Sequence, residues 1–361
     1  MKRIGILTSG GDCQGLNSTI RAVAKTLYQN CGNDGVQIIG IIDGYRGLIY
    51  NETRMMKPDD FSGILTRGGT ILGTSRQPFK LMRVIDENSV DKVAEMKKNY
   101  KKLELDCLVV LGGNGTQKTA NLLREEGLNV VSLPKTIDND LWGTDKTFGF
   151  QSAVDIATNV IDCIHTTATS HGRVFIVEVM GHKVGWLTLY AGIAGGADVI
   201  LIPEIPYDIN SVINTIKKRT ESGKKFSILA VAEGAISKEL AAMPKKKRKA
   251  AMAEIAYPSI SYKIAKEIQD ATGQETRVTV PAHFQRGGSP DAYDRVLSTR
   301  FGIAAAELII NGDYGKMVAL VNNKVVAVPL EEIAGKLKAV PADHEIVAAA
   351  RKMGICFGDE K

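Results

Sequence analysis

The chain has 361 residues, of which 44% are hydrophobic, and its formal net charge at pH 7 is +6. That length allows two lobes of ordinary domain size, each with its own buried core. No run of eighteen apolar residues occurs and no cleavable apolar leader is recognisable, so we expect no membrane partner and a cytoplasmic location. The charge is too small for this length to indicate nucleic-acid binding. The five cysteines are scattered without a CxxC pair, which argues against a disulfide framework or a zinc motif.

Short β-rich segments alternate with segments of helical periodicity along the whole chain. Strands are predicted at residues 3–8, 36–42, 107–111, 130–133, 174–179, 199–202, 226–231, 276–280 and 317–321. Helices are predicted where apolar residues recur at helical spacing, at residues 16–29, 90–102, 116–126, 150–165, 209–222 and 295–310. This alternation predicts an α/β fold with largely parallel sheets and helices on both faces.

Glycine-rich or charged clusters follow most of the predicted strands. They are SGGD at 9–12, DGYR at 43–46, GGNGT at 112–116, TIDND at 136–140, MGHK at 180–183, EG at 233–234 and HFQRGG at 283–288. Because ligands of open parallel sheets bind outside the carboxyl ends of the strands, we expect one cleft to collect these clusters.

Two of these clusters together indicate phosphoryl transfer. Asp138 and Asp140 lie two residues apart, and on extended backbone their side chains would face one substrate. The GGNGT loop follows a buried strand, and its glycines let backbone N–H groups approach an anion closely. The structural alternatives are a capped turn for the aspartates and a tight packing turn for the glycines.

The basic run KKKRK at 245–249 follows Pro244 and carries much of the positive charge. By composition it matches a nuclear-localisation pattern. Short basic runs are common on solvated insertions, so we interpret it as a solvated insert between elements.

Seven motifs, in order and with compatible spacing, resemble the 6-phosphofructokinase family. They are LTSGGD at 7–12, DGY at 43–45, RGGTILGTSR at 67–76, GGNGT at 112–116, PKTIDND at 134–140, EVMG at 178–181 and HFQRGGSP at 283–290. The resemblance implies two Rossmann-like lobes with the active site in the cleft between them. The donor lobe would comprise residues 1–149 and about 285–335, and the sugar-phosphate lobe residues 150–284 and about 336–361.

The resemblance further implies a reaction and an assembly. ATP, with Mg²⁺, would phosphorylate the 1-hydroxyl of fructose 6-phosphate, giving fructose 1,6-bisphosphate and ADP in glycolysis. The family commonly forms homotetramers, with a homodimer as the alternative, and Arg173 would reach a neighbouring subunit's site.

Individual residues match family positions. Asp138 matches the base that takes the proton of the sugar hydroxyl, Asp140 matches a carboxylate that orients substrate or magnesium, and Thr136 matches a residue that binds the transferring phosphoryl group or the sugar. The donor-binding positions are Gly11, Tyr45, Arg76, Gly113, Asn114, Gly115, Thr116 and Lys135. Among them, Tyr45 and Arg76 would flank the nucleotide base and the donor phosphates.

The substrate-binding positions include the three residues of the catalytic loop and eight others. These are Thr136, Asp138, Asp140, Arg173, Met180, Gly181, His182, Glu233, Arg277, His283 and Arg286. The resemblance implies that Arg277, Arg286 and His283 grip the 6-phosphate and that Glu233 accepts sugar hydroxyls.

Two positions depart from the family pattern. Asn114 stands at the metal-binding position where the family usually has a carboxylate, and an amide binds magnesium more weakly because it has no charge. His182 stands where the family usually has arginine, and Lys183, next to it, would point to the other side of a strand. These changes leave three readings: a phosphofructokinase, a kinase of another phosphorylated sugar, or a non-catalytic regulatory subunit. The retained aspartates argue against the last.

The donor depends on two positions with opposite preferences. Gly115 leaves space for a nucleotide and resembles ATP users, whereas Lys135 resembles pyrophosphate users. We favour ATP because a missing side chain removes a block, whereas a lysine need not exclude the nucleotide. Pyrophosphate is the alternative. A glycine-loop binding module or a nucleotide kinase such as the NAD kinase family shares the GGNGT loop alone.

Overall fold

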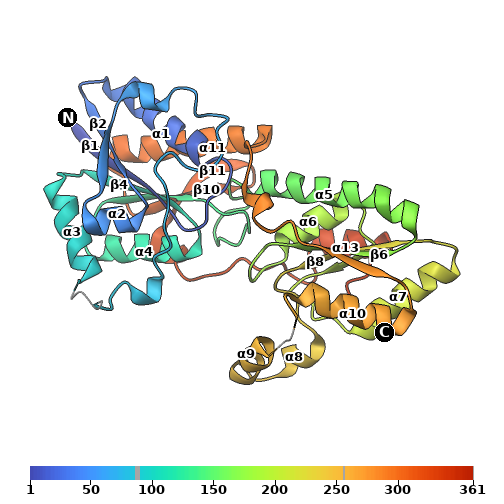
Figure 1. Cartoon of the computed structure of the whole chain (residues 1–361). Coiled ribbons are helices and arrows are strands. Elements are labelled where there is room, and N and C mark those ends of the chain that lie inside the picture. Colours follow the sequence, from blue (N-terminus) through green and yellow to red (C-terminus); the bar gives the residue numbers. More distant parts are fainter. Residues whose placement is uncertain (86–89, 255–256, 361) are drawn as a thin grey trace. The chain divides into compact units, whose positions relative to one another are not determined.

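The computed structural model describes residues 1–85, 90–254 and 257–360 (Figure 1). The chain forms two compact units: unit 1 comprises Met1–Ser152 and Arg286–Lys338, and unit 2 comprises Ala153–Gln285 and Ala339–Lys361. In chain order the elements are β1 (Lys2–Ser9), α1 (Leu16–Cys31), β2 (Val36–Ile41), α2 (Tyr45–Tyr50), β3 (Thr53–Met56), η1 (Pro58–Phe61), η2 (Phe79–Leu81), α3 (Lys92–Lys102), β4 (Cys107–Gly112), α4 (Asn114–Glu125), β5 (Val130–Pro134), α5 (Phe150–His171), β6 (Val174–Val179), α6 (Trp186–Ala194), β7 (Val199–Leu201), α7 (Ile209–Glu221), β8 (Ser227–Ala232), α8 (Lys238–Ala242), α9 (Lys245–Ala253), α10 (Ile260–Thr272), β9 (Thr276–Thr279), η3 (Ala282–Arg286), α11 (Ala292–Asn311), β10 (Lys316–Val321), β11 (Lys324–Pro329), α12 (Leu330–Ile333) and α13 (Glu345–Lys352).

Unit 1 is built on a mixed sheet with the strand order β11-β10-β5-β4-β1-β2-β3 among the described residues. The five inner strands are parallel, and the edge strands β3 and β11 run antiparallel to their neighbours. Every residue of β4 and β5 is buried, as expected of strands that are covered by helices on both faces. The largely parallel α/β fold is thus confirmed, whereas the two edge strands were not predicted.

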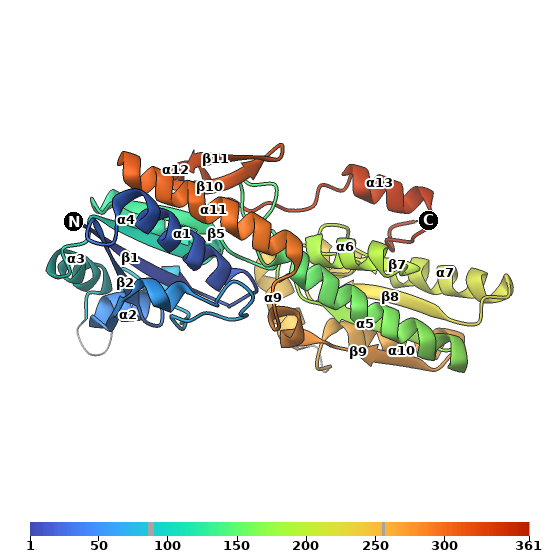
Figure 2. The ribbon, with the colours of Figure 1, turned by 90° about the horizontal axis from the view of Figure 1, so that it is seen from above.

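Helices cover both faces of this sheet. On one face α1 packs along α11, and the two lie side by side in Figure 2. Their axes come close because Gly302 of α11 faces α1, where a Cβ atom would lie 2.5 Å from that of Ala22. On the other face α2, α3 and α4 contribute Leu48, Met96 and Leu123 to one buried cluster with the strands.

Unit 2 is built on a parallel sheet with the order β7-β8-β6-β9 over the described residues. Helices α7 and α10 bury Ile216 and Ile264 against Leu229 of β8. Helices α5 and α6 lie on the opposite face (Figure 1). The C-terminal segment returns to this sheet, where Cys356 pairs with Val199 at the edge strand β7.

The basic run forms a helix, which the sequence interpretation did not include. Residues 245–249 make up the first half of α9, and four of these five side chains are exposed. The expectation that they are solvated holds, but they lie within a regular element and not between elements. Within the described ranges, no helix is long and apolar enough to cross a membrane.

Candidate active site

Three loops of unit 1 meet at one edge of its sheet because three neighbouring strands end in register. Ser9 of β1 pairs with Gly112 of β4, and Gly112 pairs with Pro134 of β5. The segments that follow these residues carry Gly11, the GGNGT loop and the two aspartates. The expected convergence at the carboxyl ends of parallel strands therefore occurs within unit 1.

The first loop is held by two cationic side chains. The ammonium group of Lys135 donates a hydrogen bond to the carbonyl of Gly11, and Nη1 of Arg286 donates to the carbonyl of Asp12 at 3.0 Å. A Cβ atom at Gly11 would lie 2.9 Å from that same Nη1. Lys135 is buried, and the loss of hydration lowers its pKa. The backbone of the loop thus lies next to the side chains of a lysine and an arginine.

The second loop opens helix α4 without a side-chain cap. Gly113 is the N-cap residue, and Asn114, Gly115 and Thr116 form the first turn. The N–H groups of a first helical turn have no partner within the helix and favour anions. Among the described residues, no atom outside the backbone of this helix and the two neighbours of Gly115 lies within 4 Å of the position that a Cβ atom there would take. Nδ2 of Asn114 donates to the carbonyl of Lys336 at 3.0 Å, so the Asn114 side chain is anchored to a distant segment.

Tyr45 contacts this loop through its phenol group. Its ring is buried in the unit 1 core, and its hydroxyl donates to the carbonyl of Thr116 at 3.0 Å. Burial keeps the pKa of this phenol well above its usual value, so it remains a donor. Tyr45, which the resemblance implied flanks the nucleotide base and the donor phosphates, is buried and contacts the second loop.

Arg76 is exposed and lies next to the first loop in space. The residue before it, Ser75, accepts a hydrogen bond from the amide of Gly10 at 3.1 Å. Thr74 adds a second bond, because its hydroxyl donates to the carbonyl of Gly10 at 2.7 Å. The segment 74–76 is therefore tied to the glycine loop that Arg76 was expected to serve.

The third loop carries the aspartates, and it is bent where extended backbone was expected. Asn139, between them, adopts a left-handed φ of 53°. Its Oδ1 accepts from the amide of Thr147 at 3.1 Å, and its Nδ2 donates to the carbonyl of Asp145 at 3.3 Å. Sequence reasoning missed Asn139, although asparagine is the residue that tolerates this conformation best after glycine.

The two carboxylates influence one another despite the bend. Burial and then the charge of Asp138 raise the pKa of Asp140 to about 6. The amide of Asp138 donates to Oγ1 of Thr136 at 3.1 Å, which closes the start of the loop. Thr136, Asp138 and Asp140 are therefore brought together, on one loop beside the turn that opens α4.

In unit 2, Glu233 organises the loop that follows β6. Its Oε1 accepts from the amides of Gly181 and His182, at 3.2 and 2.7 Å. Gly181 has a φ of 149° and His182 a left-handed φ of 53°, so these residues form a turn. The assumption that His182 and Lys183 alternate along a strand was wrong. The amide of Met180 donates to Oε1 of Gln285 at 3.2 Å, which joins η3 to the same loop.

Of the remaining basic residues, Arg173 and Arg277 lie toward the other end of the sheet from that turn. Arg173 precedes β6, and Arg277 lies on the neighbouring strand β9. Both form ion pairs with Glu275, the residue before β9. Arg173 and Met180 flank β6 and are seven residue steps apart, or about 23 Å. His283 is exposed on η3. Arg286, the last residue of η3, belongs to unit 1 and donates to the carbonyl of Asp12.

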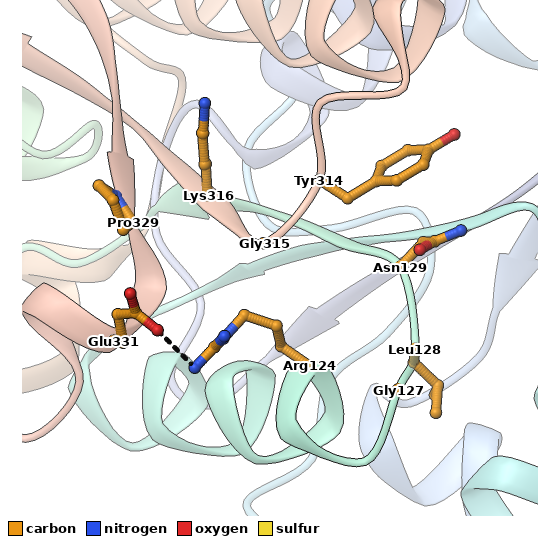
Figure 3. A pocket seen from close by; sticks show the side chains of 9 residues that line it. All are labelled: Arg124, Gly127, Leu128, Asn129, Tyr314, Gly315, Lys316, Pro329 and Glu331. Carbon is orange, nitrogen blue, oxygen red and sulfur yellow. Dashed lines mark ion pairs between the residues drawn. The ribbon is translucent and has the colours of Figure 1, made fainter.

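A pocket of about 440 Å³ opens elsewhere on unit 1 (Figure 3). It is lined by Arg124, Tyr314, Lys316 and Glu331, among others, and Arg124 pairs with Glu331 across it. Val130 and Lys316, where β5 and β10 begin, mark this as the amino end of the parallel strands. It lies at the opposite edge from the aspartates. Over residues 1–85, 90–254 and 257–360, no group of three or more His, Cys, Asp or Glu side chains is arranged to hold a metal ion by itself.

The family model and two curated relatives that match this chain are named as phosphofructokinases. The family model "Phosphofructokinase" matches residues 3–309. The chain is 59% identical to an ATP-dependent 6-phosphofructokinase of Spirochaeta thermophila, over 99% of this chain and 98% of that protein. It is 52% identical to ATP-dependent 6-phosphofructokinase 3 of Bacteroides thetaiotaomicron, over 99% of this chain and 100% of that protein.

Solved structures agree in fold. Phosphofructokinase from Saccharomyces cerevisiae matches with a TM-score of 0.79 and 30% identity, over 92% of this chain and 45% of that chain. A pyrophosphate-dependent phosphofructokinase from Nitrosospira multiformis matches with a TM-score of 0.81 but 19% identity, over 99% of this chain and 89% of that chain, and shows a shared fold alone. Because the family model spans most of the chain and the relatives match it almost from end to end, the chain belongs to the phosphofructokinase family.

Proposed function

We infer that this chain transfers the γ-phosphoryl group of ATP to the 1-hydroxyl of fructose 6-phosphate, which yields fructose 1,6-bisphosphate and ADP. The observation that carries this inference is the meeting of the Asp138–Asp140 loop with two anion-binding loops at one sheet edge. The 59% identity to an ATP-dependent 6-phosphofructokinase supports both the donor and the acceptor.

In the proposed reaction Asp138 is the general base. It takes the proton of the sugar hydroxyl as that oxygen attacks the terminal phosphorus, and the bond from phosphorus to the ADP oxygen breaks. A positioned base of this kind contributes about 10²- to 10⁴-fold to the rate. Thr136 would bind the transferring group or the sugar, and its Oγ1 is already set by the amide of Asp138.

The donor phosphates would lie on the amides that follow Gly10 and Gly113. Lys135 and Arg286 support this placement, because both bind carbonyls of the first loop and bring positive charge to it. Such fixed charges stabilise charge that develops during phosphoryl transfer without having to reorganise.

Magnesium fits the oxygen donors of this loop. Asp138 raises the pKa of Asp140, so the two carboxylates repel one another, and a cation would relieve that repulsion. Magnesium sites in phosphoryl-transfer enzymes commonly use one or two carboxylates with substrate phosphates. Asp140 would hold the ion, with Oδ1 of Asn114 as the donor from the second loop, while Asp138 keeps its role as the base. Bound there, the ion supplies charge neutralisation on the donor phosphates.

ATP is favoured over pyrophosphate by the surroundings of Gly115 and Lys135. A side chain at position 115 is what would obstruct a nucleotide, and the space there is open. Lys135 is engaged by the Gly11 carbonyl and is buried, so its presence does not by itself select pyrophosphate.

In unit 2, we assign the sugar-phosphate contacts to the turn at Met180–His182 with Glu233, and to His283. Arg277 would add charge for the 6-phosphate, and Arg173 would act in a neighbouring subunit of a homotetramer or homodimer. Both arginines pair with Glu275, so a bound phosphate would compete with this glutamate. Arg286, which the resemblance implied for the 6-phosphate, lies in unit 1 against the first loop. Glu233 already binds two amides, so its further role toward the sugar rests on Oε2.

The test is an initial-rate comparison of ATP and pyrophosphate at equal concentration, with fructose 6-phosphate and Mg²⁺. Turnover with ATP alone is expected. Turnover with pyrophosphate alone would reverse the donor assignment. If neither donor supports turnover while the protein still binds fructose 6-phosphate, the reading of a non-catalytic regulatory subunit would replace this one.

A further inference from the structure

A short segment at the end of unit 1, residues 336–338, touches two of the active-site loops. We call it the strap. Two residues separate it from α12, and it is tied to the end of that helix, because the amide of Lys336 donates to the carbonyl of Ile333 at 3.1 Å. Lys338 is the last residue of unit 1. No motif singled out in the sequence includes any of these residues.

The strap binds the backbone of the aspartate loop. Leu337 pairs with Leu141 as an isolated antiparallel bridge. Next to this bridge, the amide of Lys338 donates to the carbonyl of Asp140 at 2.9 Å. Two successive residues of the loop are therefore fixed in register by two successive residues of the strap.

The side chain of Lys338 closes the turn that follows. Its Nζ donates to the carbonyls of Thr144 and Asp145, at 2.7 and 2.9 Å. The same turn is tied to β10, because the amide of Asp145 donates to the carbonyl of Leu320 at 2.7 Å. Lys338 thus holds the loop at both ends of residues 140–145, with its amide at one end and its ammonium group at the other.

The strap also reaches the donor loop. Nδ2 of Asn114 donates to the carbonyl of Lys336 at 3.0 Å. Asn114 is the first residue of α4, and Asp140 lies on the loop after β5. One three-residue segment therefore spans the residues proposed for the donor and for the carboxylate pair.

We propose that Lys338 is a positioning residue for phosphoryl transfer, which sets Asp140 by clamping residues 140–145 while the strap keeps Asn114 in place. This inference rests on the proposed function. Supporting groups of this kind matter because a catalytic constellation must be held within a fraction of an ångström. Lys338 itself contacts carbonyls, so it acts through the loop and not on the reacting atoms.

The experiment compares Lys338→Met with Lys338→Arg, and uses Lys324→Met as the matched control. Lys324 is an exposed lysine of the same unit, on the edge strand β11. We expect Lys338→Met to lower kcat by about 10- to 100-fold, the range found for groups that orient functional ligands. KM for fructose 6-phosphate should change little, Lys338→Arg should recover most of kcat, and the control should match the parent protein. Wild-type kcat in Lys338→Met would overturn the proposal.

Amide hydrogen exchange provides a readout that does not depend on turnover. Peptides covering residues 139–146 should exchange faster in Lys338→Met than in Lys324→Met, even if the chain proves inactive with every donor. Unchanged exchange in Lys338→Met would overturn the clamp. If exchange is faster in Lys338→Met but the wild type is inactive with every donor, the clamp stands and only the proposed function is refuted. If neither Lys338 variant folds, Lys338 is required for folding and is not a positioning residue.

Discussion

Asp138 and Asp140 are identical side chains on one loop, and the burial and charges around Asp140 set its pKa. The pKa of Asp140 is raised to about 6 first by burial and then by the charge of Asp138, while Lys338 and Lys135 act in the opposite direction. A carboxylate with a raised pKa is costly to keep ionised in the folded chain. Function and stability therefore make opposite demands on this residue, as is common at active sites.

The first prediction concerns the stability of Asp140→Asn without magnesium. Because folding raises the pKa of Asp140 from 3.8 to about 6, the folded chain loses stability as pH rises through this interval, and the loss persists above it. The neutral amide avoids this loss. At pH 7, urea unfolding should show the variant to be more stable than the wild type by about 3 kcal/mol. The difference should shrink toward pH 4, and a wild type that is more stable at pH 7 would refute the raised pKa.

The second prediction concerns the base. Asp138→Asn should lower kcat by about 10²- to 10⁴-fold and leave the affinity for fructose 6-phosphate largely intact, because the amide keeps the shape but cannot accept the proton. Steady-state rates and calorimetric binding measure the two quantities. Asp313→Asn, which changes a carboxylate paired with Lys316 at the surface, serves as the control. Near-normal turnover of Asp138→Asn would remove Asp138 from the mechanism.

Single-residue geometry was the part of the site that the sequence could not supply. The motif located Asp138 and Asp140, but extended backbone between them was the wrong assumption, because Asn139 is left-handed and bonded to Thr147. The contact of Lys135 with the Gly11 carbonyl joins residues 124 positions apart. Contacts of this kind depend on how the strands are ordered, which local patterns do not encode.

In unit 1 the inner strands were predictable and the two edge strands, β3 and β11, were not. The sequence of β4, CLVVLG, is apolar because helices cover both faces of the strand. By contrast, β3 is the four-residue segment TRMM, with two exposed positions, and β11 exposes half of its six residues. Helix α6 was missed for a different reason, since WLTLYAGIA is apolar nearly all round and lacks a polar face that would reveal its period.

A third prediction belongs to the first turn of α4. Gly115→Ala and Gly115→Asp should both fold, because no described atom outside the helix backbone and the two neighbours of Gly115 lies within 4 Å of the new Cβ atom. Either residue suits a helix better than glycine, by about 0.5 to 1 kcal/mol, and aspartate adds a favourable charge at the helix N-terminus. Both variants should therefore unfold at higher temperature than the wild type.

The two variants should differ in their use of the donor. An aspartate beside the nucleotide phosphates places like charges together, so Gly115→Asp should lower kcat/KM for ATP at least about tenfold. Gly115→Ala adds a methyl group without charge and should retain more of the ATP activity. Rates with ATP and with pyrophosphate measure this. Equal loss in both variants would mean that bulk, and not charge, sets donor choice.

At the scale of the whole molecule, each unit has its own buried core. We therefore expect each ligand to slow amide exchange in the unit that binds it. Unit 1 buries its core around β1, β4 and β5, and unit 2 buries its own around β6 and β8. The alternation of strands and helices indicated an α/β chain, and its length allowed two lobes. Which segments close each unit could not be read from local pattern, because residues 286–338 return to unit 1 after more than a hundred residues of unit 2.

The last prediction tests the assignment of the donor to unit 1. A ligand that binds only the folded state stabilises it by RT ln(1 + [L]/Kd), about 2.7 kcal/mol at a hundredfold excess over Kd. A non-hydrolysable ATP analogue with Mg²⁺ should therefore slow amide exchange at residues 10–15 and 112–118. Fructose 6-phosphate alone should slow exchange at residues 180–184 and 282–285 of unit 2. Protection of the unit 2 segments by the ATP analogue, with none at the glycine loops, would contradict the assignment, because the amides proposed to bind the phosphates would then remain open to solvent.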